Sequence, residues 1–380
     1  MAFSAMGIAA AVFCVGAGAQ GAAAGSAASH SDGNSAKAKA QQVVLPVTVR
    51  DKKGALVTNL QKADLALTQD GRAQTILSLS TSHDSDQPSR IGLLVDTSRG
   101  VLGAIDAERK AAGSFLDEMM PAEAGKDEAF LLHFDREVEL VEDFTGSREK
   151  LHGELDDMGP TSHQRDDTLG PETTGDDRPR EHGSARSDQL YDAIYLAADE
   201  LMKNKDGRKI LVIFSNGADH GSKETMNDAV DAADHAGLSI YTIFFKGEKE
   251  TAYDRDGLGG GHHGGIQLPG SGGGSPGGYP GGGGGHKQPE PTSASGVDGK
   301  KIMQEIADRT GGHAYEAKHT SDLEPIYKLI ADEIKGQYLL TFTPDKPDED
   351  GGFHKVALTV TNKDWSVATR SGYYAGGGKE

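Results

Sequence analysis

The sequence predicts an α/β protein whose main domain has a doubly wound, mostly parallel sheet and whose smaller domain consists of β-strands. From residue 90 onward, short apolar runs alternate with amphipathic stretches, and strands that alternate with helices are typical of a parallel sheet covered on both faces. On either side of this region, apolar and polar residues alternate between turn signals, which is the pattern of half-buried strands. Neither flanking segment contains enough strands for an independent domain, so we expect the two to combine into one sandwich-like domain.

The composition narrows the classes of partner. The chain has 380 residues, of which 52 are glycine, and a formal net charge of -19. Nucleic acid and anionic membrane surfaces need a basic protein surface, so we expect neither as a partner. After the N-terminus, no segment has the run of about 20 apolar residues that a membrane span requires.

The N-terminus indicates export. Residues 1–19 contain an apolar stretch followed by Ala17-Gly18-Ala19, the small residues that signal peptidase needs, so we expect cleavage near Ala19. Cys14 follows Phe13, where a lipoprotein signal has a small residue, and we expect no lipidation. Residues 20–41 are rich in Ala, Gly and Ser and are predicted to be a disordered linker. The protein would then be secreted or periplasmic; a disordered leader is the alternative.

The ordered elements follow along the chain. The N-terminal β segment is expected over residues 42–85, the main domain over residues 88–335 and the C-terminal β segment over residues 336–375. Strands of the main domain are expected at Ile91–Val95, Ala129–Phe134, Ile210–Phe214, Ile240–Phe245 and His313–Tyr315, with an antiparallel edge strand at Glu137–Phe144. Apolar residues three and four apart predict helices at 190–201 and 323–334. In the C-terminal segment, strands are expected at Tyr338–Phe342, His354–Thr361 and Val367–Arg370.

Two insertions interrupt the main domain. Residues 156–186 are polar without periodicity, and residues 247–296 include "GSGGGSPGGYPGGGGGH". Neither can bury a core, and both are predicted to be loops or disorder. Histidines 262, 263 and 286 lie among glycines that offer no fixed geometry, so we do not expect a metal site there.

A carboxylate at the end of the first main-domain strand is the leading candidate for function. In "IGLLVDTSRG", residues 91–100, Asp96 stands at the carboxyl end of a buried strand, where doubly wound sheets bind ligands. Ser98 lacks the G-x-S-x-G context of a hydrolase nucleophile, Gly100 and Gly103 lack the spacing of a dinucleotide loop, and no G-K-[ST] follows. An aspartate with hydroxyls at alternate positions remains, and oxygen ligands of this kind suit a hard cation such as Mg²⁺.

The chain resembles the von Willebrand factor type A (vWA) domain, and specifically the secreted vWA-related proteins of acidobacteria. The resemblance covers most of the chain and rests on the order and spacing of several segments: "IGLLVDTSRG", "HFDREVELVEDFTGSREKL", "DQLYDAIYLAADEL", "GRKILVIFSNGADHGS" and "LEPIYKLIADEIKGQYLLTFTP". It implies a Rossmann-like vWA domain, and both flanking β segments look like those of the family.

The family also carries a metal-ion-dependent adhesion site (MIDAS), made of D-x-S-x-S in the first loop, a threonine in the second and an aspartate in the third. Asp96 and Ser98 match the first loop, but Gly100 replaces its second serine. Asp188 aligns with the threonine and Asn216 with the third-loop aspartate. The resemblance implies that Mg²⁺, or Mn²⁺ or Ca²⁺ in its place, is held by Asp96, Ser98, Asp188, Asn216 and Asp219.

These departures leave two readings of the site. Asn216 offers a carbonyl oxygen without charge, while Asp188 adds a carboxylate, so two charges are kept if both point inward. Arg99 acts in the opposite direction, because a guanidinium beside Asp96 could replace the cation. The alternative to a metal site is therefore an ion-pair network of Asp96, Arg99 and Asp188.

We expect a secreted or periplasmic adhesion module that binds a protein partner, with an acidic side chain of that partner completing the coordination of the metal. The alternative is a metal-independent structural or scaffolding protein of the cell envelope. A hydrolase that uses the region of Asp96 and Ser98 is a remote alternative, because local sequence offers no nucleophile with a base beside it. We therefore expect no enzyme activity.

Overall fold

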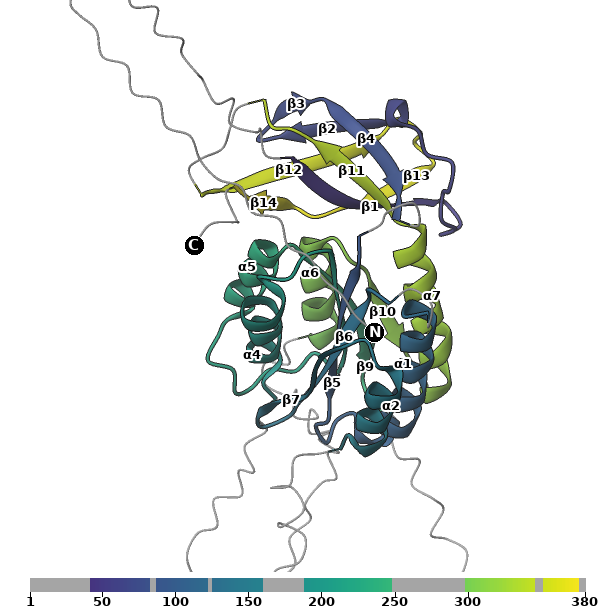
Figure 1. Cartoon of the computed structure of the whole chain (residues 1–380), viewed down its shortest axis with the longest axis vertical. Coiled ribbons are helices and arrows are strands. Elements are labelled where there is room, and N and C mark those ends of the chain that lie inside the picture. Colours follow the sequence, from purple (N-terminus) through teal and green to yellow (C-terminus); the bar gives the residue numbers. More distant parts are fainter. Residues whose placement is uncertain are drawn as a thin grey trace, which may run out of the picture. The chain divides into compact units, whose positions relative to one another are not determined.

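The computed structural model describes residues 42–82, 87–121, 125–159, 188–247, 298–345 and 351–375. The expected signal peptide, the linker with it, Cys14, nearly all of both insertions and the three histidines among the glycines lie outside the described residues. The described chain forms an α/β domain, residues 89–336, and a β sandwich that both flanking segments share (Figure 1). No helix in these ranges is long and apolar enough to cross a lipid bilayer.

The α/β domain is organised around a six-stranded sheet in the order β10-β9-β8-β5-β6-β7. Its strands are β5 (Ser89–Asp96), β6 (Glu128–Phe134), β7 (Val138–Thr145), β8 (Arg208–Ser215), β9 (Leu238–Phe245) and β10 (Ala314–Ala317). All neighbours are parallel except β7, which runs antiparallel to β6. The predicted edge strand is thereby confirmed. The order is that of doubly wound folds, with the switch of direction between β5 and β8.

Helices cover both faces of this sheet (Figure 1). One face is covered by α1 (Ile105–Met119), α2 (Arg148–Asp157) and α7 (Leu323–Gly336). The other is covered by α4 (Leu190–Tyr195), a π-helical continuation at Leu196–Met202, α5 (Met226–Ala236) and α6 (Gly299–Thr310). Short 3-10 helices lie at Lys62–Asp64, Leu102–Ala104 and Thr320–Asp322. Helix α2 extends two residues into the segment predicted as an insertion.

Local signals explain where these elements begin and end. Ser147 caps α2, since its side chain accepts a hydrogen bond from the amide of Lys150. Gly237 ends α5 in the left-handed conformation at φ 72°. The central strands are apolar on both faces because both faces are covered. His133, inside β6, is a buried histidine whose Nδ1 lies 3.2 Å from the hydroxyl of Thr97.

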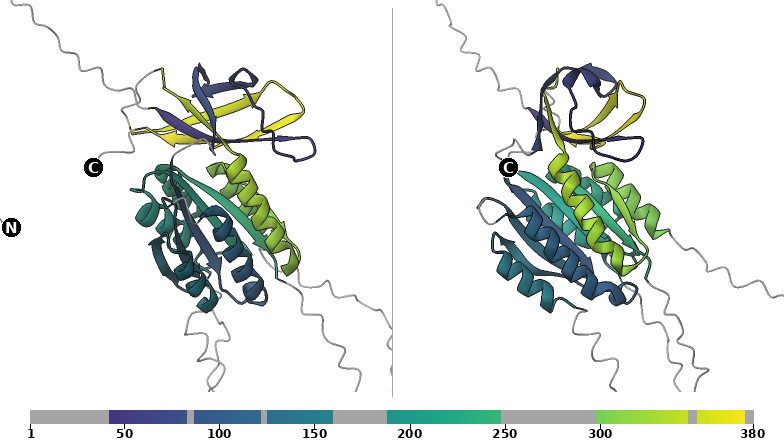
Figure 2. Two further views of the ribbon diagram at one scale, coloured as in Figure 1. Left: turned by 45° about the vertical axis from the view of Figure 1, so that its right-hand side comes forward. Right: turned by 90° about the vertical axis from the view of Figure 1, so that its right-hand side faces the viewer.

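The sandwich joins the two ends of the described chain. One sheet has the order β13-β1-β11-β4 and the other β14-β12-β2-β3, so each contains strands from both flanking segments (Figure 2). The strands are β1 (Val43–Asp51), β2 (Leu65–Gln69), β3 (Arg72–Gln74), β4 (Ile76–Thr81), β11 (Tyr338–Phe342), β12 (Phe353–Val360), β13 (Trp365–Ala368) and β14 (Gly372–Tyr374). The expected combination of the two segments is confirmed. The last predicted strand corresponds to β13, which is shifted two residues toward the N-terminus, and a further strand that was not predicted, β14, follows it.

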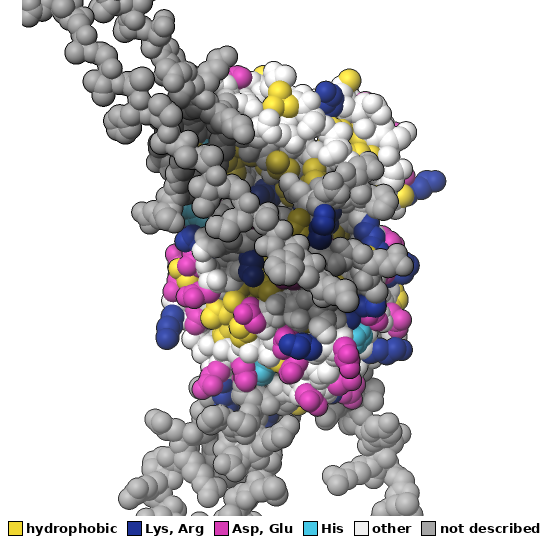
Figure 3. All heavy atoms as spheres, in the orientation of Figure 1, with side chains coloured by type: hydrophobic (Ala, Val, Ile, Leu, Met, Phe, Trp, Pro, Cys, Tyr) yellow, Lys and Arg dark blue, Asp and Glu magenta, His cyan; other side chains and the backbone are white. Residues whose placement is uncertain are grey.

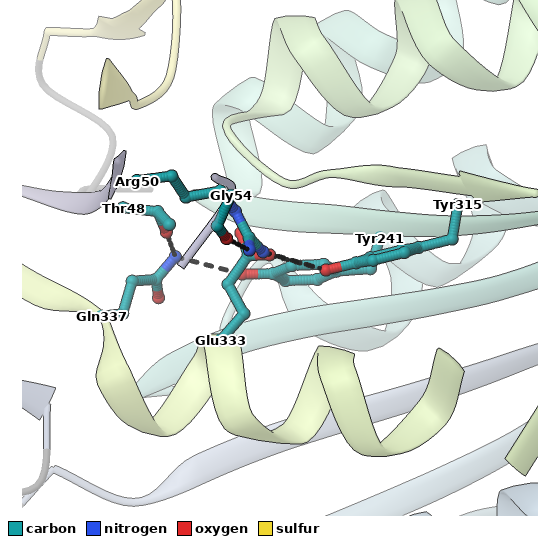
Figure 4. Close-up of polar contacts among 7 residues, drawn as sticks. All are labelled: Thr48, Arg50, Gly54, Tyr241, Tyr315, Glu333 and Gln337. Carbon is teal, nitrogen blue, oxygen red and sulfur yellow. Dashed lines mark hydrogen bonds and ion pairs between the residues drawn. The ribbon is translucent and has the colours of Figure 1, made fainter. Parts of the chain in front are cut away.

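A polar network links the sandwich to the α/β domain (Figure 4). Arg50 of β1 pairs with Glu333 of α7, whose side chain is 1% exposed. The hydroxyl of Tyr315 donates to the same carboxylate at 2.8 Å. Beside them, the amide of Gln337 donates to the hydroxyl of Tyr241 at 3.1 Å. The buried carboxylate of Glu333 therefore has both a countercharge and a hydrogen-bond donor.

A second buried carboxylate lies between helices. Glu108 of α1 is fully buried and accepts a hydrogen bond from the hydroxyl of Tyr327 on α7. Burial raises the pKa of Glu108 to about 8, against the smaller opposing effect of that hydrogen bond. At neutral pH this side chain is mostly protonated.

We predict that Glu108 makes the stability of the protein fall as the pH rises. Between about pH 4.5 and about pH 8 the unfolded chain has lost this proton and the folded chain keeps it, so the free energy of unfolding decreases by up to about 1.4 kcal/mol per pH unit. Above about pH 8 this contribution levels off. In Glu108→Gln, which keeps the acceptor for Tyr327, urea unfolding across this range should lose that slope. The exposed Glu324→Gln serves as control, and an unchanged slope in Glu108→Gln would contradict the prediction.

We predict that Arg50→Met destabilises the protein by about 3 kcal/mol, because it leaves the buried carboxylate of Glu333 without its countercharge. Adding Glu333→Gln should recover most of that loss, since the charge itself is then removed. Urea unfolding of both variants measures the difference. Equal stability of the single and double variants would show that the loss comes from packing and not from the unpaired charge.

Candidate functional site

Asp96 and Asn216 lie at the ends of adjacent strands where the direction of the sheet switches. Asp96 is the last residue of β5, and Asn216 directly follows β8. β5 and β8 are parallel neighbours, so their carboxyl ends meet at one edge of the sheet, which we call the carboxyl edge. In doubly wound folds this is the place where ligands bind.

Asp96 is held by three donors from the protein. Its Oδ1 accepts from the amide of Ser98 at 2.8 Å, and its Oδ2 accepts from the hydroxyl of Ser215 at 2.7 Å and the amide of Asn216 at 3.4 Å. The residue is 0% exposed. Burial raises the pKa of Asp96, while these hydrogen bonds act to lower it. The carboxylate is thus fixed in position at the base of the site.

The hydroxyl of Ser98 makes no hydrogen bond of good geometry, although the residue is only 4% exposed, but it lies close enough to Asp96 to lower the pKa of that carboxyl. A buried hydroxyl without a partner costs about 1–3 kcal/mol, so its presence calls for an explanation. The hydroxyl lies near Gly100, since a Cβ at position 100 would be 3.9 Å from its Oγ. Asp96 and Ser98, which the sequence motif places together, also lie together in the structure.

Gly100 and Asn216 pack against each other. A Cβ on Gly100 would lie 2.4 Å from Nδ2 of Asn216, so glycine is what admits this side chain. Oδ1 of Asn216 accepts a hydrogen bond from the amide of Ala218 at 2.7 Å. Asn216 therefore turns its amide nitrogen toward Gly100, whereas we expected its oxygen to face the site. The two departures from the family motif are physically linked.

Asp188 lies beside the buried carboxylate. Burial is the main reason that the pKa of Asp188 rises to about 6, and the charges of Asp96, Asp135 and Asp219 raise it further, while His220 acts in the opposite direction. Asp188 precedes α4, and its backbone carbonyl accepts from the amide of His220 at 3.0 Å. Several carboxylates thus converge at the carboxyl edge.

Asp219 contributes to the site's charge but also has a local role. Its Oδ1 accepts from the amide of Tyr191 at 3.2 Å and from the hydroxyl of Ser222 at 2.5 Å, so it caps the start of α4. Asp192, in the first turn of that helix, accepts from the amides of Lys223 and Glu224. These bonds hold the loop after Asn216 against α4.

Arg99 does not neutralise the site. It is exposed and forms no ion pair with Asp96 or Asp188. The network of Asp96, Arg99 and Asp188 that the sequence left open is therefore not formed. Within the described ranges no set of three or more His, Cys, Asp and Glu is arranged to hold a metal, so a cation would depend on Ser98 and water in addition to the carboxylates.

The sequence analysis did not identify two further residues of the carboxyl edge. Ser215, the last residue of β8, donates to Asp96, and Asp135 follows β6 with 1% exposure and raises the pKa of Asp188. Both stand at carboxyl ends of parallel strands, so the reasoning that found Asp96 applies to them as well. On the face in Figure 3, acidic side chains gather over the α/β domain, whereas the sandwich shows mainly uncharged surface.

No protein-family model and no curated protein matches the chain. Solved structures do resemble it. An aerotolerance-related membrane protein from Bacteroides fragilis is 13% identical, with a TM-score of 0.38, and the match covers 65% of this chain and 98% of that one. The vWF domain of the type V pilus tip protein Mfa5 from Porphyromonas gingivalis is 10% identical, with a TM-score of 0.39, over 65% of this chain and 95% of that one.

Proximal thread matrix protein 1 from the mussel byssus, in a structure with a zinc-occupied MIDAS motif, is 12% identical with a TM-score of 0.39. The match covers 65% of this chain and 48% of the mussel protein, so the chain spans about half of that protein's length. One of these structures is described as a vWF domain and another as carrying a MIDAS motif. Independently of these matches, the strand order and the two helical layers of this chain fit a Rossmann-like vWA fold.

We predict that Gly100→Ala destabilises the protein by about 1 kcal/mol, because the new methyl group displaces Asn216 and breaks its hydrogen bond to Ala218. In an Asn216→Ala background the same change should cost much less. Gly103→Ala is the control, since a Cβ there meets no atom within 4 Å. Chemical unfolding of the four members of the cycle gives the coupling. The predicted contact is absent if Gly100→Ala costs the same in both backgrounds.

Proposed function

We propose that the protein is a vWA-type binding module that holds a divalent cation at the carboxyl edge and uses it to engage an acidic group on a protein partner. Asp96, Ser98 and Asp188 would hold the cation, with Asp219 and Asn216 beside them. The observation that carries the proposal is the buried Ser98 hydroxyl, which makes no hydrogen bond of good geometry, beside two carboxylates that form no ion pair with a described residue.

The charges at this edge favour a cation. Asp96 raises the pKa of Asp188, which means that the two carboxylates repel each other in the metal-free protein. Arg99 is turned to solvent and relieves none of this repulsion. Mg²⁺, or Mn²⁺ or Ca²⁺, takes oxygen ligands and would convert the repulsion into attraction.

The oxygens present fit such an ion. Ser98 offers a free hydroxyl oxygen, Asp96 is fixed by three donors, and Asp188 is partly exposed and can adjust. So few protein ligands suit Mg²⁺, which keeps several waters. Asn216 directs its amide nitrogen toward Gly100, so its oxygen would become a ligand only after the side chain turns over.

A bound cation explains how so acidic a protein could capture an acidic partner. At a net charge of -19, the chain repels other anions over most approaches. A divalent ion at the carboxyl edge supplies local positive charge, and a carboxylate of the partner would replace one of its waters. We propose no catalytic role for Ser98, because no described base hydrogen-bonds to its hydroxyl.

We further propose that the protein is exported and acts in the periplasm or outside the cell. The signal peptide that the sequence predicts over residues 1–19 supports this location, and it lies outside the described residues. A partner exposed in the envelope is then the natural target of the carboxyl edge.

Metal titration tests the proposal. Calorimetry with Mg²⁺, Mn²⁺ and Ca²⁺ is expected to show one site, which Asp96→Asn abolishes and Ser98→Ala weakens about tenfold or more. Ser98→Ala should fold, because its hydroxyl makes no hydrogen bond of good geometry that could be lost. Ser114→Ala, at an exposed position of α1, is the matched control. If titration of the parent protein with these metals releases or absorbs no heat of binding, the metal hypothesis is wrong.

Capture from native envelope extract then addresses the partner. Binding that is lost with chelator and in Ser98→Ala supports metal-dependent adhesion. Binding that survives both treatments supports the alternative of a metal-independent scaffolding protein, which the amide of Asn216 inside the site would favour.

A further inference from the structure

A second polar pocket lies at the opposite edge of the central sheet. It has a volume of about 310 Å³ and includes the beginnings of β8 and β9, at Arg208 and Ser239. Pro46 of β1 and Leu339 of β11 also line it, so the sandwich forms part of its wall. Parallel strands start at the edge opposite the one where they end, and this amino edge is therefore distant from Asp96.

The pocket gathers positive charge in a very acidic protein. Its lining includes four basic side chains and one carboxylate, and these are Lys205, Arg208, Lys209, Arg370 and Asp206. The chain as a whole has 39 basic and 58 acidic residues. The pocket is therefore positively charged although the chain as a whole is acidic. A positively charged pocket raises the local concentration of anions.

The two lysines have partners within the protein. The ammonium of Lys209 donates to the carbonyls of Lys203 at 3.1 Å and Ala236 at 2.8 Å, the latter at the last turn of α5. Burial, followed by the charge of Arg370, lowers the pKa of Lys209 to about 8. Lys205 lies over the ring of Phe144, 4.2 Å from its centroid. A helix end and an aromatic face therefore account for both lysines.

The two arginines of the pocket have no comparable partners among the described residues. Arg370 is 8% exposed, yet its Nε has no hydrogen-bond partner, and the Nε of Arg208 is also buried without one. Neither guanidinium forms an ion pair with a described residue. Asp234 is the acid whose charge acts on Arg370, but it lies outside salt-bridge distance, and burial raises its own pKa to about 7. Guanidinium groups remain charged under all ordinary conditions, so the buried Arg370 and the half-buried Arg208 are two cations without an ion-pair partner among the described residues.

Other residues of the wall are held by contacts within the protein. Gln337 lines the pocket, and its amide is bonded to Tyr241 and Thr48 in the network of Figure 4. Gly237 leaves room for Arg370, because a Cβ there would lie 3.3 Å from its Nη2. The arginines thus line a preformed pocket and do not belong to a flexible surface.

We propose that this pocket binds a small oxyanion of the phosphate or sulfate type, held by the guanidinium groups of Arg208 and Arg370. Planar guanidinium groups match the oxygens of such anions in pairs of hydrogen bonds. The anion supplies the countercharge that neither arginine has within salt-bridge distance in the described part of the chain. Because its ligands come from β8 and from the C-terminal segment, it also joins the sandwich to the α/β domain.

The test uses inorganic phosphate and sulfate with the full chain in buffer that contains chelator, so that no divalent metal contributes. Both anions are expected to raise the melting temperature by at least about 2 °C over chloride at equal ionic strength, with saturation. Calorimetry should show a dissociation constant that Arg208→Gln raises at least about tenfold. Arg72→Gln, at an exposed position of β3, should leave it unchanged.

Arg208→Gln is expected to fold, because it removes a half-buried charge that forms no ion pair and a buried Nε that has no acceptor. Asp96→Asn should bind phosphate like the parent protein. The phosphate result therefore does not depend on whether the carboxyl edge binds a metal. A phosphate effect no larger than that of chloride, or one that is equal in Arg208→Gln and Arg72→Gln, would overturn the proposal.

Discussion

The structure depends on one constraint of connectivity: the strands that complete the sandwich come from opposite ends of the described chain. β1 pairs with β11 from Val43 opposite Phe342 to Val47 opposite Tyr338, and β2 pairs with β12. Neither sheet is complete until the α/β domain has formed, because α7, its last helix, leads directly into β11, the strand that pairs with β1. The entropy of closing a loop grows only slowly with its length, and the apolar core that the sandwich buries offsets it.

The same connectivity gives the central sheet two chemically different edges. β5 starts at Ser89, a few residues after β4 of the sandwich, so the amino edge meets the sandwich and the carboxyl edge points away from it (Figure 1). Charged side chains are buried or half-buried at both edges. Whether such a side chain has a partner of opposite charge indicates whether its role is structural or in binding. Glu333 has Arg50 and Tyr315, which is the pattern of a structural contact. Asp188 at one edge and Arg370 at the other lack a countercharge within salt-bridge distance, and we assign the binding proposals to these groups.

Much of the fold follows from local pattern. Each predicted strand of the central sheet is present within two residues of its expected ends, since an apolar run bounded by polar residues reports burial directly. The strand β14 that follows β13 was not predicted. The break at Thr369 to Ser371 follows from the partners of the two strands, because β13 pairs with β1 and β14 with β12. That choice of partner is not encoded in the segment itself.

The sequence by itself determined the order of strands and helices, the position of Asp96 at the end of a strand and its spacing to Ser98, because these depend on neighbours along the chain. Only the tertiary structure decided that Arg99 faces solvent, that the amide of Asn216 fills the space above Gly100, and that Arg208 and Arg370 share a pocket. The physical reason is distance along the chain. These contacts join residues more than 100 positions apart, and their geometry is set by how the sheet, its helices and the sandwich pack together, which no local periodicity records.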